Sequence, residues 1–364
     1  MTGVGAIHQF VAGFADGDAI SNEARVLRSV FRGWGCASDI FSEPRCVMPT
    51  LRREALDVAG YAARQDPRDV ILLHLSIGSA VNEAFARLQC RRAILYHNVT
   101  PAVWFETINP QTASVLARAQ DQIRRLSGVA RVNMADSAFN ASEMAAAGYG
   151  DVKVLPLAID FERLRGESDR PTLRHMQDGL TNVLFVGRGA PNKRIEDALK
   201  AFYYFHKCVE PRSRFIHAGS YAGTERYRWL LEAQVKALGL EQDAVLFAGA
   251  VPQPALNALY GAAGLFLCMS EHEGFGVPLI ESMVHDLPVL AFRAGAVAET
   301  LDGAGVLFSN KNFIAVAEMM GRLTRDAAFR QAVIDGQRKR LRRYEERDVA
   351  AELRRHLAPL LADA

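Results

Sequence analysis

Short apolar runs alternate with helical patterns along almost the whole chain. In the first half, the runs that predict buried strands are Val4–Val11, Val70–Leu75, Ala93–Tyr96, Val129–Met134 and Val152–Leu155. Amphipathic patterns that predict helices, such as Glu23–Phe31 and Ala138–Ala147, lie between several of these runs. The alternation restarts with runs at Asn182–Val186, Arg214–His217, Val245–Phe247, Leu265–Cys268, Val289–Ala291 and Val306–Phe308. Strands that alternate with helices favour parallel sheets covered by helices.

The segment from residue 160 to 180 interrupts this alternation. It is polar and contains two glycines and a proline, so it is the best candidate for a linker. A chain of 364 residues is also long for a single core. We therefore predict an α/β fold with two Rossmann-like domains, 1–162 and 163–344, that face a central cleft. The last segment, 345–364, has a helical pattern and could pack back on the first domain.

Composition adds few constraints on function. Hydrophobic residues make up 49% of the chain and charged residues 23%, and the net charge is +2, so nothing demands a nucleic-acid partner. The five cysteines are scattered and lack a C-x-x-C pair, which argues against a disulfide framework or a zinc site and fits a reducing cytoplasm. The N-terminal residues lack the basic region of a signal peptide.

Membrane contact is expected to be weak and peripheral. No uncharged apolar run approaches the roughly 20 residues that a membrane span needs. Through residue 162, 16 Lys and Arg are balanced by 17 Asp and Glu, although Arg25, Arg28 and Arg32 could form a local basic patch. The basic run Arg338–Arg343 is followed at once by acidic residues, which favours a solvated helix face. We expect a cytoplasmic protein that could make contact with the inner face of the cytoplasmic membrane.

The strongest candidate for a functional site is the stretch S-E-H-E-G-F-G-V-P-L-I-E, residues 270–281, which contains three carboxylates, a histidine and two glycines. It follows an apolar run that ends at Met269 and precedes an apolar helical pattern, so it forms a strand-to-helix turn. Open α/β sheets bind ligands at the carboxyl ends of their strands, and a helix N-terminus attracts anions. Glu273 and Glu281 could both face one crevice, although an acidic first turn that complements the helix dipole would also explain one of them.

A second candidate element is the loop V-G-R-G-A-P-N-K-R, which follows the first strand of the second domain. Arg188 and Lys193 lie five residues apart in it, next to Gly187. A planar guanidinium and a mobile ammonium together suit phosphate oxygens, whereas carboxylates accept hydrogen bonds from sugar hydroxyls. If both loops rise from one sheet edge, the pattern describes a pocket for a nucleoside diphosphate sugar.

These elements resemble glycosyltransferase family 4, retaining enzymes of the GT-B fold. The resemblance rests on E-x7-E from Glu273 to Glu281, the V-G-R…N-K-R loop, L-P-L-A-I-D ending at Asp160, G-A-V-A-E-T ending at Thr300, Y-H-N-V-T-P from Tyr96, and the loop G-F-A-D-G-D-A-I-S-N. It spans nearly the whole chain and is more specific in the second domain. H-N-V-T-P together with E-H-E-G-F-G resembles the bacterial mannosyl- and glucosyltransferases of this family.

The resemblance implies roles for individual residues. Arg188 and Lys193 would bind the diphosphate beside Gly187, Glu273 and the backbone of Gly274, Phe275 and Gly276 would bind the donor sugar, and Glu281 would bind the ribose. His97 resembles the active-site histidine of the family, and Glu299 would lie near the donor. The first loop departs from the family pattern, because Gly17 and Asp18 stand where a Gly-Gly pair is common.

Several of these residues also have structural explanations. His97 could cap the strand that precedes it, and Asp16 and Asp18 could be turn or helix-cap residues. Trp104 and Phe105 could belong to the core or stack on an acceptor sugar. The sequence alone leaves these alternatives open.

The mechanism of the family that the sequence resembles implies no metal or cofactor. The departing diphosphate is thought to take the proton of the acceptor, so electrostatic stabilisation by Arg188, Lys193 and helix N-termini would be the main contribution of the protein. We therefore expect a metal-independent hexosyltransferase that uses a GDP- or UDP-sugar, with GDP-mannose favoured, and a glycan or lipid-linked acceptor of bacterial surface polysaccharide. The alternatives are a nucleotide-sugar epimerase of the same fold and an inactive nucleotide-sugar-binding partner subunit.

Overall fold

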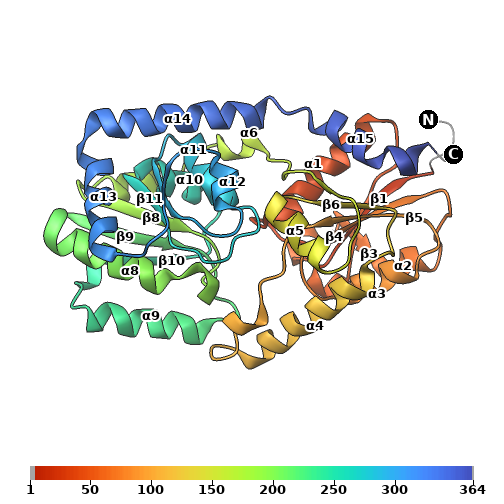
Figure 1. Ribbon diagram of the computed structural model, residues 1–364, viewed down its shortest axis with the longest axis horizontal. Coiled ribbons are helices and arrows are strands. Elements are labelled where there is room, and N and C mark those ends of the chain that lie inside the picture. The colour runs from red at the N-terminus through yellow and green to blue at the C-terminus, as the bar shows by residue number, and fades with distance from the viewer. Residues whose placement is uncertain (1–4, 363–364) are drawn as a thin grey trace. The chain divides into compact units, whose positions relative to one another are not determined.

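The computed structural model describes residues 5–362 and forms two compact units. The first unit takes in the chain up to Ala102, residues 113–160 and the chain from Asp348 on, whereas the second contains residues 103–112 and 161–347. Each unit is built on its own parallel sheet with helices on both faces (Figure 1). The fold class predicted from the sequence, two Rossmann-like α/β domains, is confirmed.

The first unit contains a seven-stranded sheet. Its strands are β1 (Ile7–Val11), β2 (Ile40–Ser42), β3 (Ala55–Asp57), β4 (Val70–Leu75), β5 (Arg91–Tyr96), β6 (Val132–Ala135) and β7 (Val152–Val154). They are all parallel and lie in the order β3-β2-β1-β4-β5-β6-β7. The order reverses between β1 and β4, where Ile7 pairs with Val70. Ligands of open α/β sheets bind at the carboxyl ends of the strands at such a reversal.

Helices α1 and α15 cover one face of this sheet (Figure 1). The helices around the sheet are α1 (Ala19–Gly33), α2 (Val58–Ala62), α3 (Ala80–Arg87), α4 (Pro110–Leu126), α5 (Ala138–Ala146) and α15 (Val349–Leu361). On α15, the spacing of Leu353, Leu357 and Leu360 directs all three side chains into the core formed with β1, β4, β5 and β6. Each is at most 1% exposed, and burying one leucine contributes about 1.5–3 kcal/mol. The C-terminal segment therefore packs on the first sheet.

The second unit contains a six-stranded parallel sheet in the order β10-β9-β8-β11-β12-β13. Its strands are β8 (Thr181–Val186), β9 (Ser213–Ala218), β10 (Val245–Gly249), β11 (Leu265–Cys268), β12 (Val289–Phe292) and β13 (Val306–Phe308). The order reverses between β8 and β11, which pair in parallel through Val183 and Leu265. The loops that follow these two strands are the two elements singled out in the sequence, so neighbouring strands deliver them to the same edge.

The second sheet is also covered on both faces. Its helices are α6 (Phe161–Leu164), α7 (Arg170–Met176), α8 (Ile195–Tyr204), α9 (Glu225–Ala237), α10 (Gln253–Ala262), α11 (Val277–Val284), α12 (Val297–Leu301), α13 (Phe313–Arg325) and α14 (Ala327–Glu345). A π-helical turn, η5 (Phe205–Val209), continues α8. Figure 1 shows α8 and α9 on one face and α10, α11 and α14 on the other. This arrangement leaves the carboxyl ends of β8 and β11 to the loops.

The strand predictions are confirmed apart from their ends and two omissions. The predicted start of the first strand, Val4, lies outside the described residues. Strands β2 and β3 were not predicted, because each contains only two apolar residues in succession before Ser42 or Asp57, which is no recognisable strand pattern. The segment predicted as a linker contains α6 and α7 instead. Asp169 caps α7 by accepting from Thr172 N at 2.8 Å, and Pro171 stands in the first turn, where a missing N–H costs nothing.

The basic run lies on α14. There Arg338 pairs with Asp286 at 2.7 Å and Arg343 with Asp302 at 2.8 Å, while Leu341 is buried beneath them. The run is thus an ion-paired, solvated helix face.

Candidate active site

The turn between β11 and α11 has a glycine where the helix begins. Gly276 is the N-cap of α11 and has φ of 90°, a left-handed conformation that favours glycine. Pro278 stands in the first turn of the helix. The side chain of Phe275 is buried and meets the ring of Tyr344 edge-on at 6.2 Å. Phe275 therefore anchors the turn in the core, and its backbone is what remains for contact with a ligand.

The G-A-V-A-E-T element supports this turn from behind. Ala296 N donates to Glu273 O at 2.9 Å, and Thr300 Oγ1 donates to Phe275 O at 2.5 Å. Gly295 has φ of 51°, and a Cβ added there would lie 2.3 Å from Glu273 O. The close approach therefore requires glycine. This element thus positions the Glu273 backbone, and the place of Glu299 near the donor stays a prediction.

The loop after β8 is packed just as closely. Gly187 has φ of 151°, and a Cβ added to Gly219 would lie 1.7 Å from Gly187 O. A Cβ at Gly189 would lie 2.1 Å from the ring of Tyr221. These glycines let the loops after β8 and β9 lie backbone against backbone.

Asn192 ties the two predicted loops together. Its side-chain Nδ2 donates to His272 O at 3.0 Å, and Glu271 N donates to its carbonyl at 2.9 Å. The side chain that follows, Lys193, forms an ion pair with Glu273, with 2.7 Å between Nζ and Oε2. The two side chains are 19% and 13% exposed, so the pair lies at the rim of the loops and not in the core.

Arg188 lies apart from this ion pair. Its guanidinium is directed to Ala222 O at 3.2 Å and lies over the ring of Phe105, with 6.0 Å from Cζ to the ring centroid. The residue is exposed, whereas Phe105 is buried and Trp104 half-buried. Phe105 is thus buried and also lies beneath the Arg188 guanidinium, a contact that the sequence did not indicate.

Glu281 lies one turn into α11 and is held by the neighbouring helix α10. Its Oε2 accepts a hydrogen bond from Tyr260 Oη at 2.6 Å. Burial raises the pKa of Glu281, although the hydrogen bond from Tyr260 acts in the opposite direction. This carboxyl group is therefore more basic than an exposed glutamate.

The other charges of the motif belong to a structural ion-pair network. Glu271 pairs with Lys311 at 2.6 Å and with Arg194 at 3.4 Å, and both cations also pair with Asp197. The Asp197 side chain is 3% exposed, and a carboxylate so buried requires paired cations. Arg194 and Glu271 thus fix the loops, while their neighbours Lys193 and Glu273 face each other at the rim.

The first loop of the first unit is a helix start. Asp18 is the N-cap of α1 and accepts from Ser21 N at 2.8 Å and from Ser21 Oγ at 2.7 Å. Gly17 has φ of 77°, and Asp16 pairs with Arg25 at 3.2 Å. The alternative explanation of Asp18 as a capping residue is thus correct. The role of Gly17 and Asp18 in donor binding stays a prediction.

His97 follows β5 and has buried polar partners at both ring nitrogens. Nδ1 lies 3.2 Å from Asp136 Oδ2, and Nε2 lies 2.9 Å from His74 Nδ1 and 3.5 Å from Glu23 Oε2. Burial by itself lowers the pKa of His97. The hydrogen bond to Asp136 and the charge of Glu23 outweigh burial and raise it.

The structure brings together some of the predicted residues and adds others. Lys193 and Glu273 are in contact, and Gly274–Gly276 form the turn beside them. Arg188 and Glu281 have separate partners in the second unit, and His97, Gly17 and Asp18 belong to the first unit. The residues that sequence reasoning missed are Asn192, Gly295, His74 and Asp136. Asn192 and Gly295 stand inside the quoted motifs, whereas His74 and Asp136 carried no local signal beyond a position at the end of a strand.

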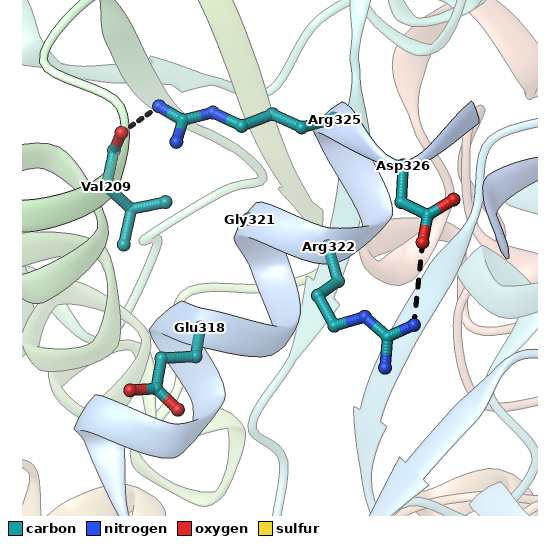
Figure 2. Close-up of a pocket in the computed structure, with 6 residues that line it drawn as sticks. All are labelled: Val209, Glu318, Gly321, Arg322, Arg325 and Asp326. Atoms are coloured by element: carbon teal, nitrogen blue, oxygen red, sulfur yellow. Dashed lines mark hydrogen bonds and ion pairs between the residues drawn. The ribbon is translucent and has the colours of Figure 1, made fainter. Parts of the chain in front are cut away.

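A pocket of the second unit lies away from these residues, between η5 and α13 (Figure 2). It is lined by Val209, Glu318, Gly321, Arg322, Arg325 and Asp326. Arg325 donates to Val209 O and pairs with Glu210 at 3.2 Å, and Arg322 pairs with Asp326 at 3.5 Å. Because Arg322 and Arg325 already have protein partners and the pocket contains none of the candidate site residues, it is not part of the candidate site.

None of the helices between residues 5 and 362 is both long and apolar enough to cross a membrane.

Residues 175–340 match the family model of glycosyl transferases group 1. The O-antigen chain mannosyltransferase B of Escherichia coli is 26% identical over 149 residues, which cover 41% of this chain and 38% of the relative. The GDP-mannose:cellobiosyl-diphosphopolyprenol alpha-mannosyltransferase of Xanthomonas campestris is 27% identical over 230 residues, 62% of this chain and 53% of the relative. These matches thus span about two fifths to half of the relatives' length.

Solved structures extend the similarity in fold to nearly the whole chain. The crystal structure of Anabaena Alr3699/HepE in complex with UDP and glucose aligns with a TM-score of 0.71 at 18% identity and covers 99% of this chain and 100% of the other. At this identity the likeness establishes the fold. The match of residues 175–340 to the glycosyl transferases group 1 model, the mannosyltransferase relatives and this shared fold agree with the resemblance to GT-B glycosyltransferases of family 4 that the sequence indicated.

Proposed function

We propose that this protein is a glycosyltransferase that moves a hexose, mannose or glucose, from a nucleoside diphosphate sugar to a glycan or lipid-linked acceptor, with retention of anomeric configuration. The observation that carries this proposal is the Lys193–Glu273 ion pair. It stands at the carboxyl ends of β8 and β11, where the strand order reverses, beside a glycine turn that opens a helix. A cation, a carboxylate and a helix N-terminus at one sheet edge suit a phosphate and a hydroxyl of the same ligand.

In this proposal Lys193 and Arg188 bind the diphosphate and stabilise the charge that grows on it as the sugar leaves. Glu273 and the backbone of Gly274–Gly276 bind the hydroxyl groups of the sugar. The Lys193–Glu273 pair holds both side chains in place, since each restricts the rotamers of the other. Glu281, steadied by Tyr260, accepts a hydrogen bond from the ribose. No metal is assigned to these steps, because the two cations supply the positive charge.

GDP-mannose is the favoured donor. The E. coli and Xanthomonas relatives are named as mannosyltransferases, and the second name includes GDP-mannose. A UDP-sugar is the alternative, because the Anabaena structure contains UDP and glucose. The relatives' names also favour an acceptor in bacterial surface polysaccharide synthesis. We place the enzyme in the cytoplasm, at most in weak contact with the inner face of the membrane.

Thermal stabilisation by a panel of nucleotide sugars would test the donor site, because a ligand that binds only the folded state raises its stability. We expect one GDP- or UDP-hexose to raise Tm, and we expect Lys193→Met and Glu273→Ala to abolish the shift. Lys311→Met is the matched control. Lys311 is a lysine of similar exposure, 15%, that pairs with Glu271, two residues before Glu273 in the same loop, so this variant should lower Tm without abolishing the ligand shift.

Product analysis with the stabilising donor separates transfer from the two alternatives. Transfer to an added polyprenol-linked or soluble glycan acceptor, with the anomeric configuration of the donor sugar retained in the product, supports the proposal. Conversion of the donor without any acceptor would identify an epimerase. Binding without turnover across the acceptor panel would identify a partner subunit. A ligand shift that survives in both Lys193→Met and Glu273→Ala would overturn the assignment of this site.

A further inference from the structure

Four buried polar side chains form one hydrogen-bonded row across the first sheet. Gln9 of β1 lies 2.9 Å from His74 of β4, between Oε1 and Nε2. His74 Nδ1 lies 2.9 Å from His97 Nε2, after β5, and His97 Nδ1 lies 3.2 Å from Asp136 Oδ2, after β6. Gln9 and His74 are 0% exposed, and the side chains of His97 and Asp136 are 2% exposed. No step of the proposed reaction accounts for Gln9 or His74.

The orientation of the Gln9 amide fixes the tautomer of His74. Gln9 Nε2 lies 2.9 Å from Ala24 O, and because a carbonyl can only accept, the amide nitrogen must face it. Gln9 Oε1 therefore faces His74 Nε2, which must donate. A neutral imidazole carries one N–H, so His74 Nδ1 is an acceptor.

Because His74 Nδ1 accepts a hydrogen bond, His97 must carry a proton on each of its two ring nitrogens. With His74 Nδ1 accepting, the hydrogen between the two rings belongs to His97 Nε2. The other nitrogen of His97 faces the Asp136 carboxylate, which also accepts. Asp136 Oδ1 accepts a further hydrogen bond from Asn140 Nδ2 at 2.5 Å, which favours the ionised carboxylate. Since imidazole is the stronger base of the two, His97 holds both protons as an imidazolium.

The ring geometry supports a hydrogen bond between the histidines. The rings are nearly parallel, with 7° between their planes and 5.1 Å between their centroids. The planes cannot be separated by a full stacking distance, because two ring nitrogens are only 2.9 Å apart. The centroid distance is close to the N···N distance plus the two ring radii. The rings therefore lie edge to edge, with Nδ1 and Nε2 directed at each other.

This geometry argues against a metal site. Ligand atoms of Glu23, His74 and His97 lie within 4.8 Å of one another, a grouping that could hold a cation. A metal ligated by both histidines would need both nitrogen lone pairs to point at a third position. Here they point at each other, so the row is a proton-holding network.

The charged groups around His97 come from three elements. Glu23 belongs to α1 and Asp18 is its N-cap, and Asp136 precedes α5, whereas His74 of β4 is neutral. Glu23 Oε1 accepts from Ala158 N at 3.0 Å, which leaves its Oε2 beside both histidines at 3.5 and 3.7 Å. Burial, with a smaller effect of His97, lowers the pKa of His74, whereas the pKa of His97 is raised. These opposite directions agree with the hydrogen-bond assignment.

We propose that Gln9 and His74 are positioning residues that keep His97 doubly protonated at the carboxyl edge of the first sheet. The inference rests on the proposed transfer function for its consequence: His97 supplies positive charge during the reaction and cannot take the proton of the acceptor hydroxyl. Because the row is internal to the first unit, the protonation state itself does not depend on that function.

Nitrogen NMR of the imidazole rings tests the assignment directly. In the full-length protein at pH 7, we expect both ring nitrogens of His97 to be protonated and His74 to carry its proton on Nε2 only. In Gln9→Leu, His74 is released to the other tautomer, and the pKa of His97 should fall by about one unit, comparable to the loss of one hydrogen bond. Gln122→Leu is the control, since Gln122 hydrogen-bonds Ser79 and Asn82 away from the histidines.

Three results would overturn the proposal. A neutral His97 in the unmodified protein at pH 7, or a proton on His74 Nδ1, would contradict the row as assigned. Simultaneous shifts of both histidines on stoichiometric addition of Zn²⁺ would establish a metal site instead. If transfer activity is found, its high-pH limb should move with the His97 pKa in Gln9→Leu and remain in place in Gln122→Leu. If no transfer is found, the NMR assignment still stands or falls by itself.

Discussion

Replacing Gly295 by alanine should disable the donor site through the backbone of Glu273. Gly295 has φ of 51°, and an added Cβ would lie 2.3 Å from Glu273 O and 3.0 Å from Glu273 N. Ordinary contact begins at 3.4 Å, so the Glu273 carbonyl must retreat by roughly 1 Å. That movement would stretch its hydrogen bond from Ala296 N and displace the carboxylate that pairs with Lys193.

The matched control is Gly303→Ala. Gly303 has φ of 83°, and an added Cβ there meets nothing within 4 Å. Both variants force alanine into a left-handed conformation, at about 1–2 kcal/mol each. For a domain of this size, each kcal/mol lowers Tm by about 2–4 °C. Only Gly295→Ala adds the clash with the Glu273 backbone.

Thermal unfolding with and without the stabilising nucleotide sugar, followed by steady-state kinetics, measures the two effects. We expect both variants to lose a few degrees of Tm, and Gly295→Ala alone to lose the ligand shift and about 10²-fold in kcat/KM, the usual effect of a displacement near 1 Å. If Gly295→Ala keeps the ligand shift and the kcat/KM of Gly303→Ala, the position of the Glu273 backbone does not control the site and the reasoning fails.

Three further predictions address individual charges. Glu281→Ala should mainly raise the donor KM, because the ribose is unchanged in the reaction, whereas Arg188→Ala should lower kcat by roughly 10²–10³; steady-state kinetics at saturating acceptor decides, and unchanged constants would remove that residue from the site. Transfer should persist in excess chelator, and a complete loss that added Mg²⁺ reverses would contradict metal independence. The raised pKa of Glu281 in the folded protein means that ionisation of this carboxyl group opposes folding. This unfavourable contribution to stability is absent at acid pH and appears as the pH rises above the pKa that Glu281 has in the unfolded chain. Glu281→Gln should therefore raise Tm at pH 8 more than at pH 4, and equal changes in the two melts would argue that ionisation of Glu281 costs the fold nothing.

The α/β class and nearly every central strand could be predicted from the sequence. A strand covered by helices on both faces is mostly apolar, so β4, β8, β11 and β12 each contain a run of four apolar residues. Its turn chemistry also located the loops of the site, since Gly276 and Pro278 mark a helix start whatever surrounds them. The short strands β2 and β3, which extend the sheet beyond β1, were not predicted because their own residues give no clear pattern and their positions depend on neighbours in the sheet.

Which charges face each other depends on the tertiary structure and could not be predicted from the sequence. Glu271 and Glu273 are two residues apart, yet the first joins the Asp197 network and the second pairs with Lys193, 80 residues earlier. The same holds for His97, whose protonation depends on Gln9, His74 and Asp136 from three other strands or strand ends. Local sequence sets backbone conformation within a few residues, whereas hydrogen bonds and ion pairs depend on distances that sheet order alone establishes.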